Sequence, residues 1–272
     1  MVADDGGVAE IPCGNPALID LRSEAEFLRG HWPGAANFPW EQLPGRAHEL
    51  PPKDAALRVA DSDPQRAHHA AEWLRRRGHH VEIVPLDPLQ LTETGHRQVR
   101  LWQPNPFLVE ALERTGAPRR DRRALDLACG SGRDAVYLAL AGWDVLAVDI
   151  LPDALDRARD LARRNGVNIT TERSDLETGA TLRPGQFDLV VVFRYLHRPL
   201  FGALREAVAA GGYIVYETFH GKTLETGRPP RNPAHLLQSG ELANAFDGFE
   251  IVIARDAVER DGRYVSSVLA RK

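Results

Sequence analysis

Cysteine is scarce in this chain, and long apolar runs are missing. The two cysteines among 272 residues, Cys13 and Cys129, are too few for a disulfide framework. No stretch is long and apolar enough to span a bilayer. The polar residues 1–15 lack the basic region and apolar core of a secretory signal. These absences predict a cytoplasmic protein with no membrane partner.

A strong excess of charge of either sign is also missing. The formal net charge is −4, and the hydrophobic and charged fractions of 43% and 26% are ordinary for a globular protein. Without an overall basic field, nucleic acid is not an expected partner. We find no internal repeat, and 272 residues suffice for one large or two medium domains.

Prolines divide the chain into two segments of different character. Pro85, Pro88, Pro104 and Pro106 punctuate its middle. We therefore predict a first domain over residues 1–90, a linker over 91–102 and a second domain over 103–272.

Both segments have the alternation of short apolar strands and helices that is typical of α/β domains. In the first, we expect strands at 17–20, 37–38, 57–60 and 81–84, with helices at 23–28 and 65–77. In the second, helical spacing begins at 107–114. Strands are expected there at 124–128, 144–149, 168–173, 187–193, 212–217, 249–255 and 264–270, with helices at 133–141, 153–165 and 200–210. This order predicts a parallel sheet with helices on both faces, whose last two strands pair antiparallel.

The most informative stretch is residues 124–132, which read ALDLACGSG. An apolar strand carries Asp126 and ends in a turn containing Gly130 and Gly132, before an amphipathic helix. Parallel α/β sheets build nucleotide-type pockets in this way. A carboxylate inside the turn repels a pyrophosphate and suits a cationic or amine-bearing ligand.

Two further acids follow the next two strands. Asp149 ends one strand, where it can accept hydrogen bonds from a ribose diol. Asp175 follows the other strand and can accept from an adenine amino group. Three successive strands therefore end in or beside a carboxylate.

This layout resembles the class I S-adenosylmethionine-dependent methyltransferases, which have a Rossmann-like seven-stranded sheet. The turn and helix look most like the tellurite-resistance and thiopurine type, and the match covers residues 101–272. The resemblance implies that Asp126 and the turn backbone hold the methionine end of the cofactor, that Asp149 holds the ribose, and that Asp175 and Leu176 hold the adenine. The family's first turn glycine is Ala128 here. The full cofactor-binding set that it implies is Asp126, Ala128, Gly130, Gly132, Arg133, Asp149, Ile150, Asp175, Leu176 and Phe193.

A dinucleotide site is the rival interpretation. Gly130, Gly132 and Ala135 fit the relaxed dehydrogenase fingerprint. Asp126 argues against it, because a pyrophosphate needs neutral or positive surroundings, and so does alanine in the third position. Cys129 is better explained as a small turn residue than as a nucleophile, because the sequence offers it no basic partner.

Candidate catalytic residues follow the fourth and fifth strands. Arg194, Tyr195, His197 and Glu217 are placed there to hold or deprotonate a methyl acceptor, and Arg198 offers a second guanidinium for an anionic group. The alternative is a structural ion-pair cluster of Arg194, Arg198 and Glu217, with His197 as a surface turn residue. Residues 220–233 form either a substrate-covering loop or an inert connection. We expect a small-molecule acceptor.

Residues 18–37, LIDLRSEAEFLRGHWPGAAN, closely resemble the rhodanese signature. Rhodaneses carry sulfur as a persulfide on a loop cysteine, and the matching loop here is residues 61–66. Aligning Arg66 with the family's loop arginine puts Asp61 where the cysteine belongs, and a carboxylate cannot form a persulfide. We predict a domain that does not transfer sulfur but packs against its neighbour, forms a homodimer, or binds a partner or regulator.

Two other functions stay open. A non-catalytic protein that senses the cofactor or binds a partner would use the same pocket without turnover, and a sulfurtransferase would need a different loop alignment. We expect no metal, because His68 and His69 point in different directions on a helix, and His79 and His80 lack carboxylate or cysteine companions.

Overall fold

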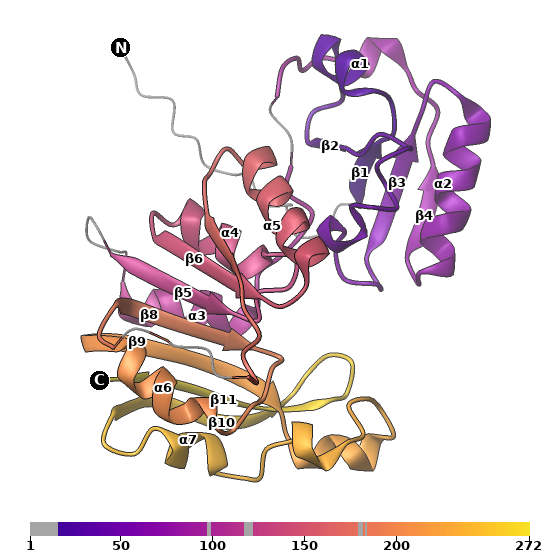
Figure 1. The fold of residues 1–272 in the computed structure, drawn as a ribbon. Helices are drawn as coiled ribbons and strands as arrows, with labels where there is room; N and C mark the ends of the chain where they lie inside the picture. Colours follow the sequence, from indigo (N-terminus) through magenta and orange to yellow (C-terminus); the bar gives the residue numbers. More distant parts are fainter. Residues whose placement is uncertain (1–15, 97–98, 117–121, 179–181, 183) are drawn as a thin grey trace. The chain divides into compact units, whose positions relative to one another are not determined.

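The computed structural model describes residues 16–96, 99–116, 122–178, 182 and 184–272. The chain divides into two compact units, Met1–Gln103 and Pro104–Lys272 (Figure 1). Both are α/β units with parallel strands, as the sequence predicts.

The N-terminal unit is a four-stranded parallel sheet in the order β2-β1-β3-β4. Ser23 and Asp63 cap its two α-helices by accepting hydrogen bonds from backbone amides of their first turns. Its elements are β1 (Ala17–Asp20), α1 (Glu24–Arg29), β2 (Ala35–Asn37), η1 (Ala47–Glu49), β3 (Ala56–Ala60), α2 (Pro64–Arg76), β4 (His80–Ile83) and η2 (Pro88–Gln90).

The described residues of the segment expected to be a linker, 91–96 and 99–102, make contacts with this unit. Glu93 pairs with His31 in an isolated antiparallel bridge, and the amide of Gly95 donates to the carbonyl of Leu28 at 3.0 Å. Leu101 is buried in the core with the side chains of β1 and β3. Burial of this leucine and pairing of the backbone explain why the described part of the segment folds onto the unit.

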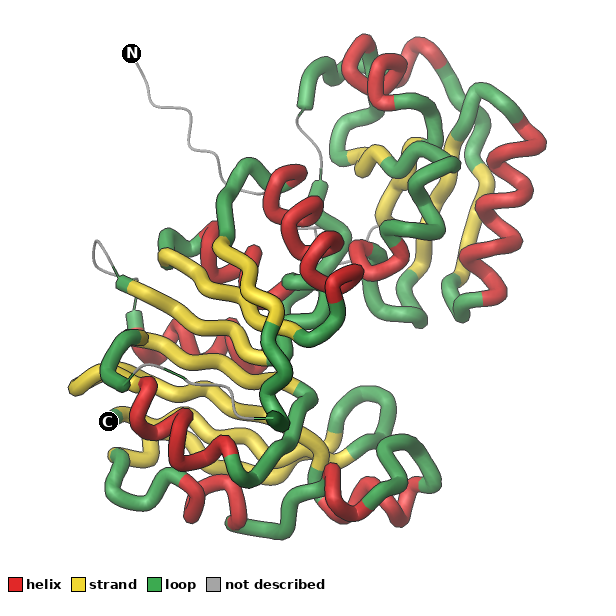
Figure 2. Tube along the Cα trace, in the orientation of Figure 1, coloured by secondary structure: helices red, strands yellow, loops and turns green. Residues whose placement is uncertain are grey.

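The C-terminal unit is a seven-stranded sheet in the order β10-β11-β9-β8-β5-β6-β7. All neighbours are parallel except β11, which runs antiparallel to both β9 and β10. Figure 2 shows its strands in one twisted layer with helices on either side. Its elements are α3 (Pro106–Thr115), β5 (Arg123–Leu127), α4 (Arg133–Leu140), β6 (Asp144–Asp149), α5 (Pro152–Arg164), β7 (Thr170–Arg173), β8 (Phe187–Phe193), α6 (Leu200–Ala207), β9 (Val208–Phe219), η3 (Gly221–Thr226), η4 (Pro233–His235), α7 (Glu241–Ala245), β10 (Glu250–Val258) and β11 (Tyr264–Arg271).

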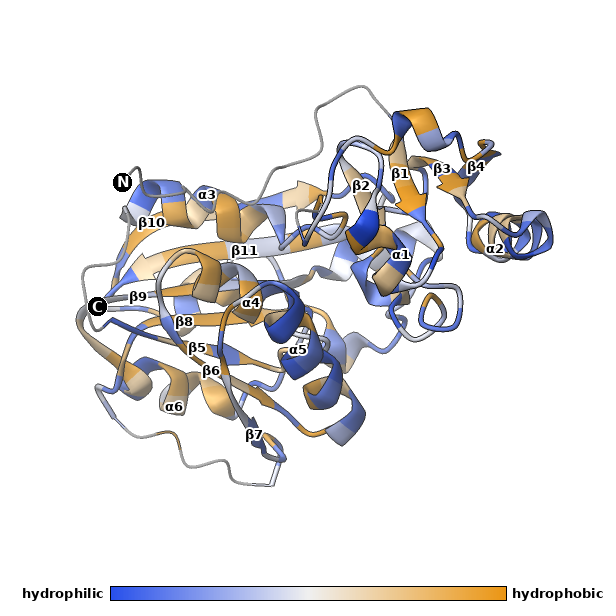
Figure 3. Cartoon of the chain, turned by 90° about the horizontal axis from the view of Figure 1, so that it is seen from above, coloured by the Kyte–Doolittle hydropathy of each residue, from blue (hydrophilic) through white to orange (hydrophobic). Residues whose placement is uncertain are grey.

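Alternate residues of the central strands fill two separate cores. Leu189 and Val191 of β8 pack with α3 and α4 on one face. Val190 and Val192 pack with α6 and α7 on the other. Strands buried on both faces are apolar along their length, and in Figure 3 the central strands are largely orange while α5 is mostly blue. The sheet therefore forms a rigid support whose loops gather at its two ends.

Several predicted boundaries were wrong, most clearly at the junction of α6 and β9. The helix expected over residues 200–210 ends at Ala207, because Val208 already pairs with Phe187 and a register shift follows between Phe187 and Leu189. Strand β9 is correspondingly longer than the expected 212–217. Helix α7 and the four short 3-10 helices were not predicted.

Candidate functional site

The predicted site residues gather at the carboxyl ends of β5, β6, β7, β8 and β9. These strands are parallel neighbours in the order β9-β8-β5-β6-β7, so their carboxyl ends meet along one edge of the sheet. Asp126, Asp149, Phe193 and Glu217 lie on four of these strands, and Phe193 and Glu217 are register partners. This is the edge at which open α/β sheets bind ligands.

The turn between β5 and α4 is tightly wound. Ala128 adopts a φ of 56°, a left-handed conformation that glycine takes without strain. Gly130 and Gly132 are left-handed as well, with φ of 55° and 78°. The amide of Gly130 donates to Oδ2 of Asp149 at 2.8 Å, which ties the turn to the end of β6.

The two glycines serve different purposes. A Cβ on Gly132 would lie 2.5 Å from Cβ of Ala158, so this glycine allows α4 and α5 to pack closely. A Cβ on Gly130 would meet nothing within 4 Å. Gly130 therefore borders open space, where a ligand can approach the backbone.

Asp126 lies beneath this turn with 2% of its surface exposed. The amide of Ala135 donates to its carboxyl group, but its Oδ2 has no hydrogen-bond partner among the described residues. Burial, followed by repulsion from Asp134 and Asp149, raises the pKa of the Asp126 carboxyl well above its usual range. An unpaired buried carboxyl oxygen is costly, so it points to a ligand that completes the site.

Asp149 is held in place by two backbone amides. Its Oδ2 accepts from Gly130, and its Oδ1 accepts from Leu151 at 2.9 Å. Each oxygen retains a further lone pair for a ligand hydroxyl. Ile150 and Leu151, which follow it, are large apolar residues with 47% and 58% of their surface exposed.

Asp175 and Leu176 follow β7 in a bend. Oδ1 of Asp175 accepts from the amide of Glu177 at 3.0 Å, and Leu176 is buried against the core. Arg133, also predicted to contact the cofactor, is exposed at the first position of α4.

The ends of β8 and β9 carry a hydrogen-bonded charge cluster. Glu217 is almost fully buried, and its Oε1 lies 3.3 Å from Nη2 of Arg194. The same Oε1 accepts from Nδ2 of Asn105 at 3.0 Å, and Oε2 accepts from Oγ of Ser267 at 2.6 Å. The backbone amide of Asn105 also donates to Asp134 at 2.6 Å. Asn105 therefore links the end of β9 to the first turn of α4.

Glu259, in the hairpin after β10, completes this cluster and was not predicted. It pairs with Nη2 of Arg194, while its Oε2 is buried without a hydrogen-bond partner among the described residues. Burial raises the pKa of Glu259 against the opposing effects of Arg194 and Arg263. Arg194 itself is left-handed, with a φ of 59°, a strained conformation of the kind found at functional sites.

Sequence reasoning missed Asn105, Ser267 and Glu259. An asparagine before Pro106 is a helix-start signal, and Asn105 does cap α3, but its second role depends on a contact 112 positions away. No sequence signal marks Glu259 or Ser267.

The remaining predicted catalytic residues have different surroundings. The hydroxyl of Tyr195 is buried without a hydrogen-bond partner among the described residues. Burial, with the nearby Glu177 and Asp175, raises the pKa of Tyr195 to about 12. This phenol therefore lies toward the loop that follows β7. The side chain of His197 forms no hydrogen bond or ion pair with any described residue, and only its carbonyl is engaged, by the amide of Leu200.

Arg198 has a structural role instead of a place in the cluster. Its Nε lies 2.5 Å from Oε1 of Glu241, and its terminal nitrogens donate to the carbonyls of Ala234 and Leu236 at 2.8 Å. Arg198 therefore fastens the segment before α7 to the end of β8. The expected joint cluster of Arg194, Arg198 and Glu217 is only partly formed, because Arg198 does not reach Glu217.

The start of the 220–233 segment is anchored to β11. The amide of Tyr264 donates to Oγ1 of Thr223, and this hydroxyl donates to the carbonyl of Tyr264, both at 2.9 Å. His220 is buried, and its Nδ1 accepts from the amide of Lys222 at 3.1 Å. These contacts fix residues 220–226 as a folded 3-10 turn.

Cys129 does not have the surroundings of a nucleophile. Burial, together with Asp126 and Asp149, raises the pKa of its thiol, so the reactive thiolate is disfavoured. Cys13 lies outside the described residues.

In the N-terminal unit, Asp61 fills the loop that follows β3. Its side chain is fully buried, and Oδ1 accepts from Nη2 of Arg66 at 2.7 Å, from the amide of Asp63 at 2.9 Å and from Oγ of Ser62 at 3.3 Å. The loop arginine and a loop amide are thus already occupied by an acid of the loop itself.

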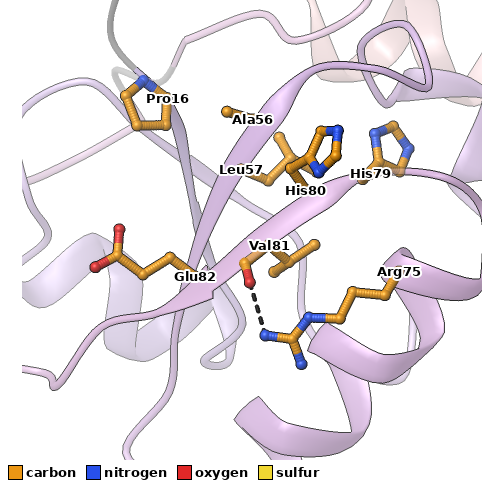
Figure 4. Close-up of a pocket in the computed structure, with 8 residues that line it drawn as sticks. All are labelled: Pro16, Ala56, Leu57, Arg75, His79, His80, Val81 and Glu82. Carbon is orange, nitrogen blue, oxygen red and sulfur yellow. Dashed lines mark hydrogen bonds between the residues drawn. The ribbon is translucent and has the colours of Figure 1, made fainter.

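A hollow of about 450 Å³ lies at the opposite end of this sheet (Figure 4). It is lined by the amino-terminal ends of β3 and β4, including Ala56 and His80, and by Arg75, which donates to the carbonyl of Val81 at 2.6 Å. His79 at its wall is buried, and burial and the nearby Lys53 lower the pKa of this histidine. His79 is therefore neutral at physiological pH.

The described residues, 16–96, 99–116, 122–178, 182 and 184–272, lack two features. They contain no group of three or more His, Cys, Asp or Glu side chains arranged to hold a metal. They also contain no helix with the length and apolar character needed to cross a membrane.

Comparison with known families finds two matches. Residues 8–87 match the family described as rhodanese-like domain, and residues 124–212 match a family described as methyltransferase domain. The two matched ranges lie in the two structural units.

Individual proteins that are similar to this chain align either with nearly all of it or with part of it. Uncharacterized protein UNK4.09 of Schizosaccharomyces pombe is 24% identical over an alignment that covers 97% of this chain and 94% of that protein. A ubiquinone biosynthesis O-methyltransferase of Bordetella avium is 28% identical, covering 57% of this chain and 66% of its own length. This chain therefore spans slightly less than two thirds of that relative.

Among solved structures, an S-adenosylmethionine-dependent methyltransferase from Mesorhizobium loti has the same fold as the C-terminal unit. The superposition has a TM-score of 0.50 at 23% identity and covers 62% of this chain and 99% of the other.

Proposed function

We propose that this chain, which carries a rhodanese-like domain before a methyltransferase domain, uses S-adenosylmethionine to methylate a small molecule at the carboxyl edge of β5, β6, β8 and β9. The observation that carries the proposal is the open space at Gly130, whose amide is bonded to the Asp149 carboxylate, in the turn that follows Asp126, whose Oδ2 has no hydrogen-bond partner among the described residues.

The residues present fit the cofactor. Asp126 and the turn backbone would face the amino-acid end, and the Asp149 carboxylate would accept from the ribose hydroxyls. Ile150, Asp175 and Leu176 would surround the adenine, with the exposed side chain of Ile150 as an apolar contact. Ala128, Gly132, Arg133 and Phe193 complete the proposed wall. When bound, S-adenosylmethionine supplies an electrophilic methyl carbon on a positively charged sulfur.

Near the proposed methyl acceptor, Glu217 and Arg194 have a positioning role and do not take part in the reaction. Glu217 has both oxygens engaged by Asn105, Arg194 and Ser267, so it anchors Arg194. Arg194 is neutralised by Glu217 and Glu259, and it does not offer a free cation to an anionic acceptor.

Three polar atoms in this region lack hydrogen-bond partners among the described residues. They are Nη1 of Arg194, the hydroxyl of Tyr195 and Oε2 of Glu259, the last of which lies 3.8 Å from Nη2 of Arg263. We assign them to the acceptor, with the Glu259 carboxylate able to accept its proton. His197 stays a candidate base on its place in the sequence.

The acceptor atom can be narrowed by the relatives. Two of the similar proteins are named ubiquinone biosynthesis O-methyltransferase and align with 57% and 48% of this chain. We therefore propose a hydroxyl oxygen on a neutral or cationic small molecule as the first acceptor to test.

The rhodanese-like domain is proposed to have a partner-binding or regulatory role without sulfur transfer. The support is Asp61, whose carboxylate occupies the loop where a persulfide would form.

Titration calorimetry with S-adenosylhomocysteine tests the cofactor site. The wild type is expected to bind, and Asp149→Ala is expected to bind about tenfold more weakly or worse, a loss of about 1.4 kcal/mol. Asp144→Ala is the matched control, because Asp144 begins the same strand at the opposite end of the sheet and is exposed. Undiminished binding by Asp149→Ala, or displacement of the ligand by NADH, would overturn the assignment.

A turnover screen tests the reaction. Small phenols and alcohols are compared with thiols and carboxylates, with S-adenosylhomocysteine formation as the readout. Product with hydroxyl compounds supports the proposal. Cofactor binding without any methyl acceptor supports a non-catalytic sensor instead.

A further inference from the structure

The proposed cofactor site contains a buried acid that nothing in the protein neutralises. Asp126 is 2% exposed and receives one backbone hydrogen bond, from Ala135. Its Oδ2 is buried and has no hydrogen-bond partner among the described residues. A carboxylate in such surroundings is strongly disfavoured unless a cation or a proton compensates it.

The groups that face Asp126 add negative charge. Strand β6 contributes Asp149, and the first turn of α4 contributes Asp134. The turn adds the Cys129 thiol, which burial keeps protonated, and β8 places the apolar Val191 in register. No described cation forms an ion pair with Asp126.

At Asp134, as at Asp126, burial and neighbouring charges act together on the carboxyl group. It accepts from the Asn105 amide, and it lies near Arg133, Arg194 and the like-charged Glu217. Burial raises the pKa of Asp134, although the Asn105 amide and the two arginines oppose the shift. Neither arginine is committed to Asp134, because Arg133 is exposed to solvent and Arg194 is paired with Glu217 and Glu259.

We propose that Asp126 and Asp134 retain a proton in the ligand-free protein, and that the amino-acid end of the bound cofactor expels it. This inference rests on the proposed function, because it takes the methionine end to lie over Asp126. The ammonium group of the ligand takes the place of the proton beside the two carboxyl groups, and that proton leaves to solvent. Because the ligand's own carboxylate balances its ammonium, the net charge of the complex falls by one when the proton leaves.

Two consequences follow from this exchange. Affinity should rise with pH wherever the free pair is protonated, by up to about tenfold per pH unit. The pair also determines specificity, because a ligand without the amino-acid end cannot replace the proton. The site should therefore discriminate against adenosine compounds that lack an ammonium group, and this discrimination should grow with pH.

Calorimetry in phosphate and in Tris at pH 7 measures the exchange. The two buffers differ in ionisation enthalpy, so proton release appears as a buffer-dependent heat. S-adenosylhomocysteine is compared with 5′-methylthioadenosine, which has the same adenosine and thioether but no amino acid. We expect net proton release with the first ligand and none with the second.

Variants locate the proton. Asp126→Asn should still bind S-adenosylhomocysteine but release no proton, and Asp134→Asn should reduce the release. Asp134→Asn also serves if Asp126→Asn fails to fold. Asp144→Asn is the matched control, since Asp144 is exposed at the opposite end of β6 and the variant should bind both ligands and release the proton as the wild type does.

The outcomes separate the two proposals. Binding of S-adenosylhomocysteine without proton release, or equal release by wild type and Asp126→Asn, overturns this inference and leaves the cofactor site standing. Proton release with 5′-methylthioadenosine overturns it too, because binding of the adenosine part alone would then cause the release. A lack of any binding of S-adenosylhomocysteine overturns both.

Discussion

Gly130 and Gly132 are two residues apart in one turn, yet the structure gives them different tasks. Gly132 is needed for packing, because its added Cβ would lie 2.9 Å from Cα of Ala158 as well as 2.5 Å from its Cβ. We expect Gly132→Ala to lower the free energy of unfolding by about 3 kcal/mol, from overpacking and the left-handed backbone together. Urea denaturation measures this loss.

Gly130→Ala is the matched comparison. Its Cβ meets no atom within 4 Å, so only the backbone strain of about 1–2 kcal/mol remains. Its affinity for S-adenosylhomocysteine should fall by about tenfold or more, because the methyl group projects into the ligand's space. Gly130→Ala with normal affinity, or Gly132→Ala with normal stability, would contradict this division of roles.

The position of each acidic residue along the chain explains which site residues could be predicted from the sequence. Asp126 and Asp149 end or nearly end apolar strands, so the sequence alone places them at the sheet edge. Glu259 follows no such rule. It reaches Arg194 only because β10 and β11 fold back beside β9, a pairing between residues 65 positions apart.

Between elements, Asp256 joins three parts of the sheet edge. Its Oδ1 accepts from Ser266 on β11 at 2.7 Å, and its Oδ2 accepts from Ser239 before α7 at 2.9 Å. Its Oδ2 also lies 3.7 Å from Nε2 of His220. Burial alone would raise the pKa of Asp256, but the hydrogen bonds from Ser266 and Ser239 lower it below its usual value.

The pH dependence of stability follows from that direction. A lowered pKa in the folded state stabilises the protein above the unfolded pKa, and this contribution is lost as pH falls through the folded value. We expect Asp256→Asn to be less stable than wild type by about 1–2 kcal/mol at pH 7, with the gap closing below about pH 4. Urea denaturation across this range measures the gap.

Asp247→Asn is the control for this prediction. Asp247 is exposed and undergoes the same change of charge. It should match wild type at every pH. A gap for Asp256→Asn that stays constant down to pH 3 would show that the carboxylate charge is not what stabilises the edge.

The elements themselves were predictable to different degrees. Strand β8 is apolar from Leu189 to Phe193 and lies at the centre of the sheet, so its composition defines it. Helix α7 has five residues and is held by the distant Arg198 through Glu241, which no local pattern reveals. Ala209 and Ala210 favour a helix locally, but pairing of β9 with β8 prevails. Local pattern thus determines the centre, and tertiary contacts determine the periphery.

At the scale of the whole molecule, one chain contains both a rhodanese-like domain and a methyltransferase domain. The alignment with the Schizosaccharomyces pombe protein extends over 97% of this chain and therefore across both units. The sequence identified both domains from short motifs. It also predicted the loss of the cysteine, and the structure adds that Asp61 is bound internally by Arg66 and the Asp63 amide.

This arrangement predicts a full-length protein without sulfurtransferase activity. With thiosulfate and cyanide as substrates, thiocyanate should stay at the uncatalysed level, because Asp61 cannot form a persulfide and the buried Cys129 thiol resists ionisation. A cysteine-containing rhodanese, assayed beside it, shows that the reagents work. Cys13→Ser and Cys129→Ser identify the carrier if thiocyanate does form. Thiocyanate that appears with wild type and disappears with either variant would mean that a cysteine outside the 61–66 loop carries sulfur, and it would contradict the prediction that this chain does not transfer sulfur.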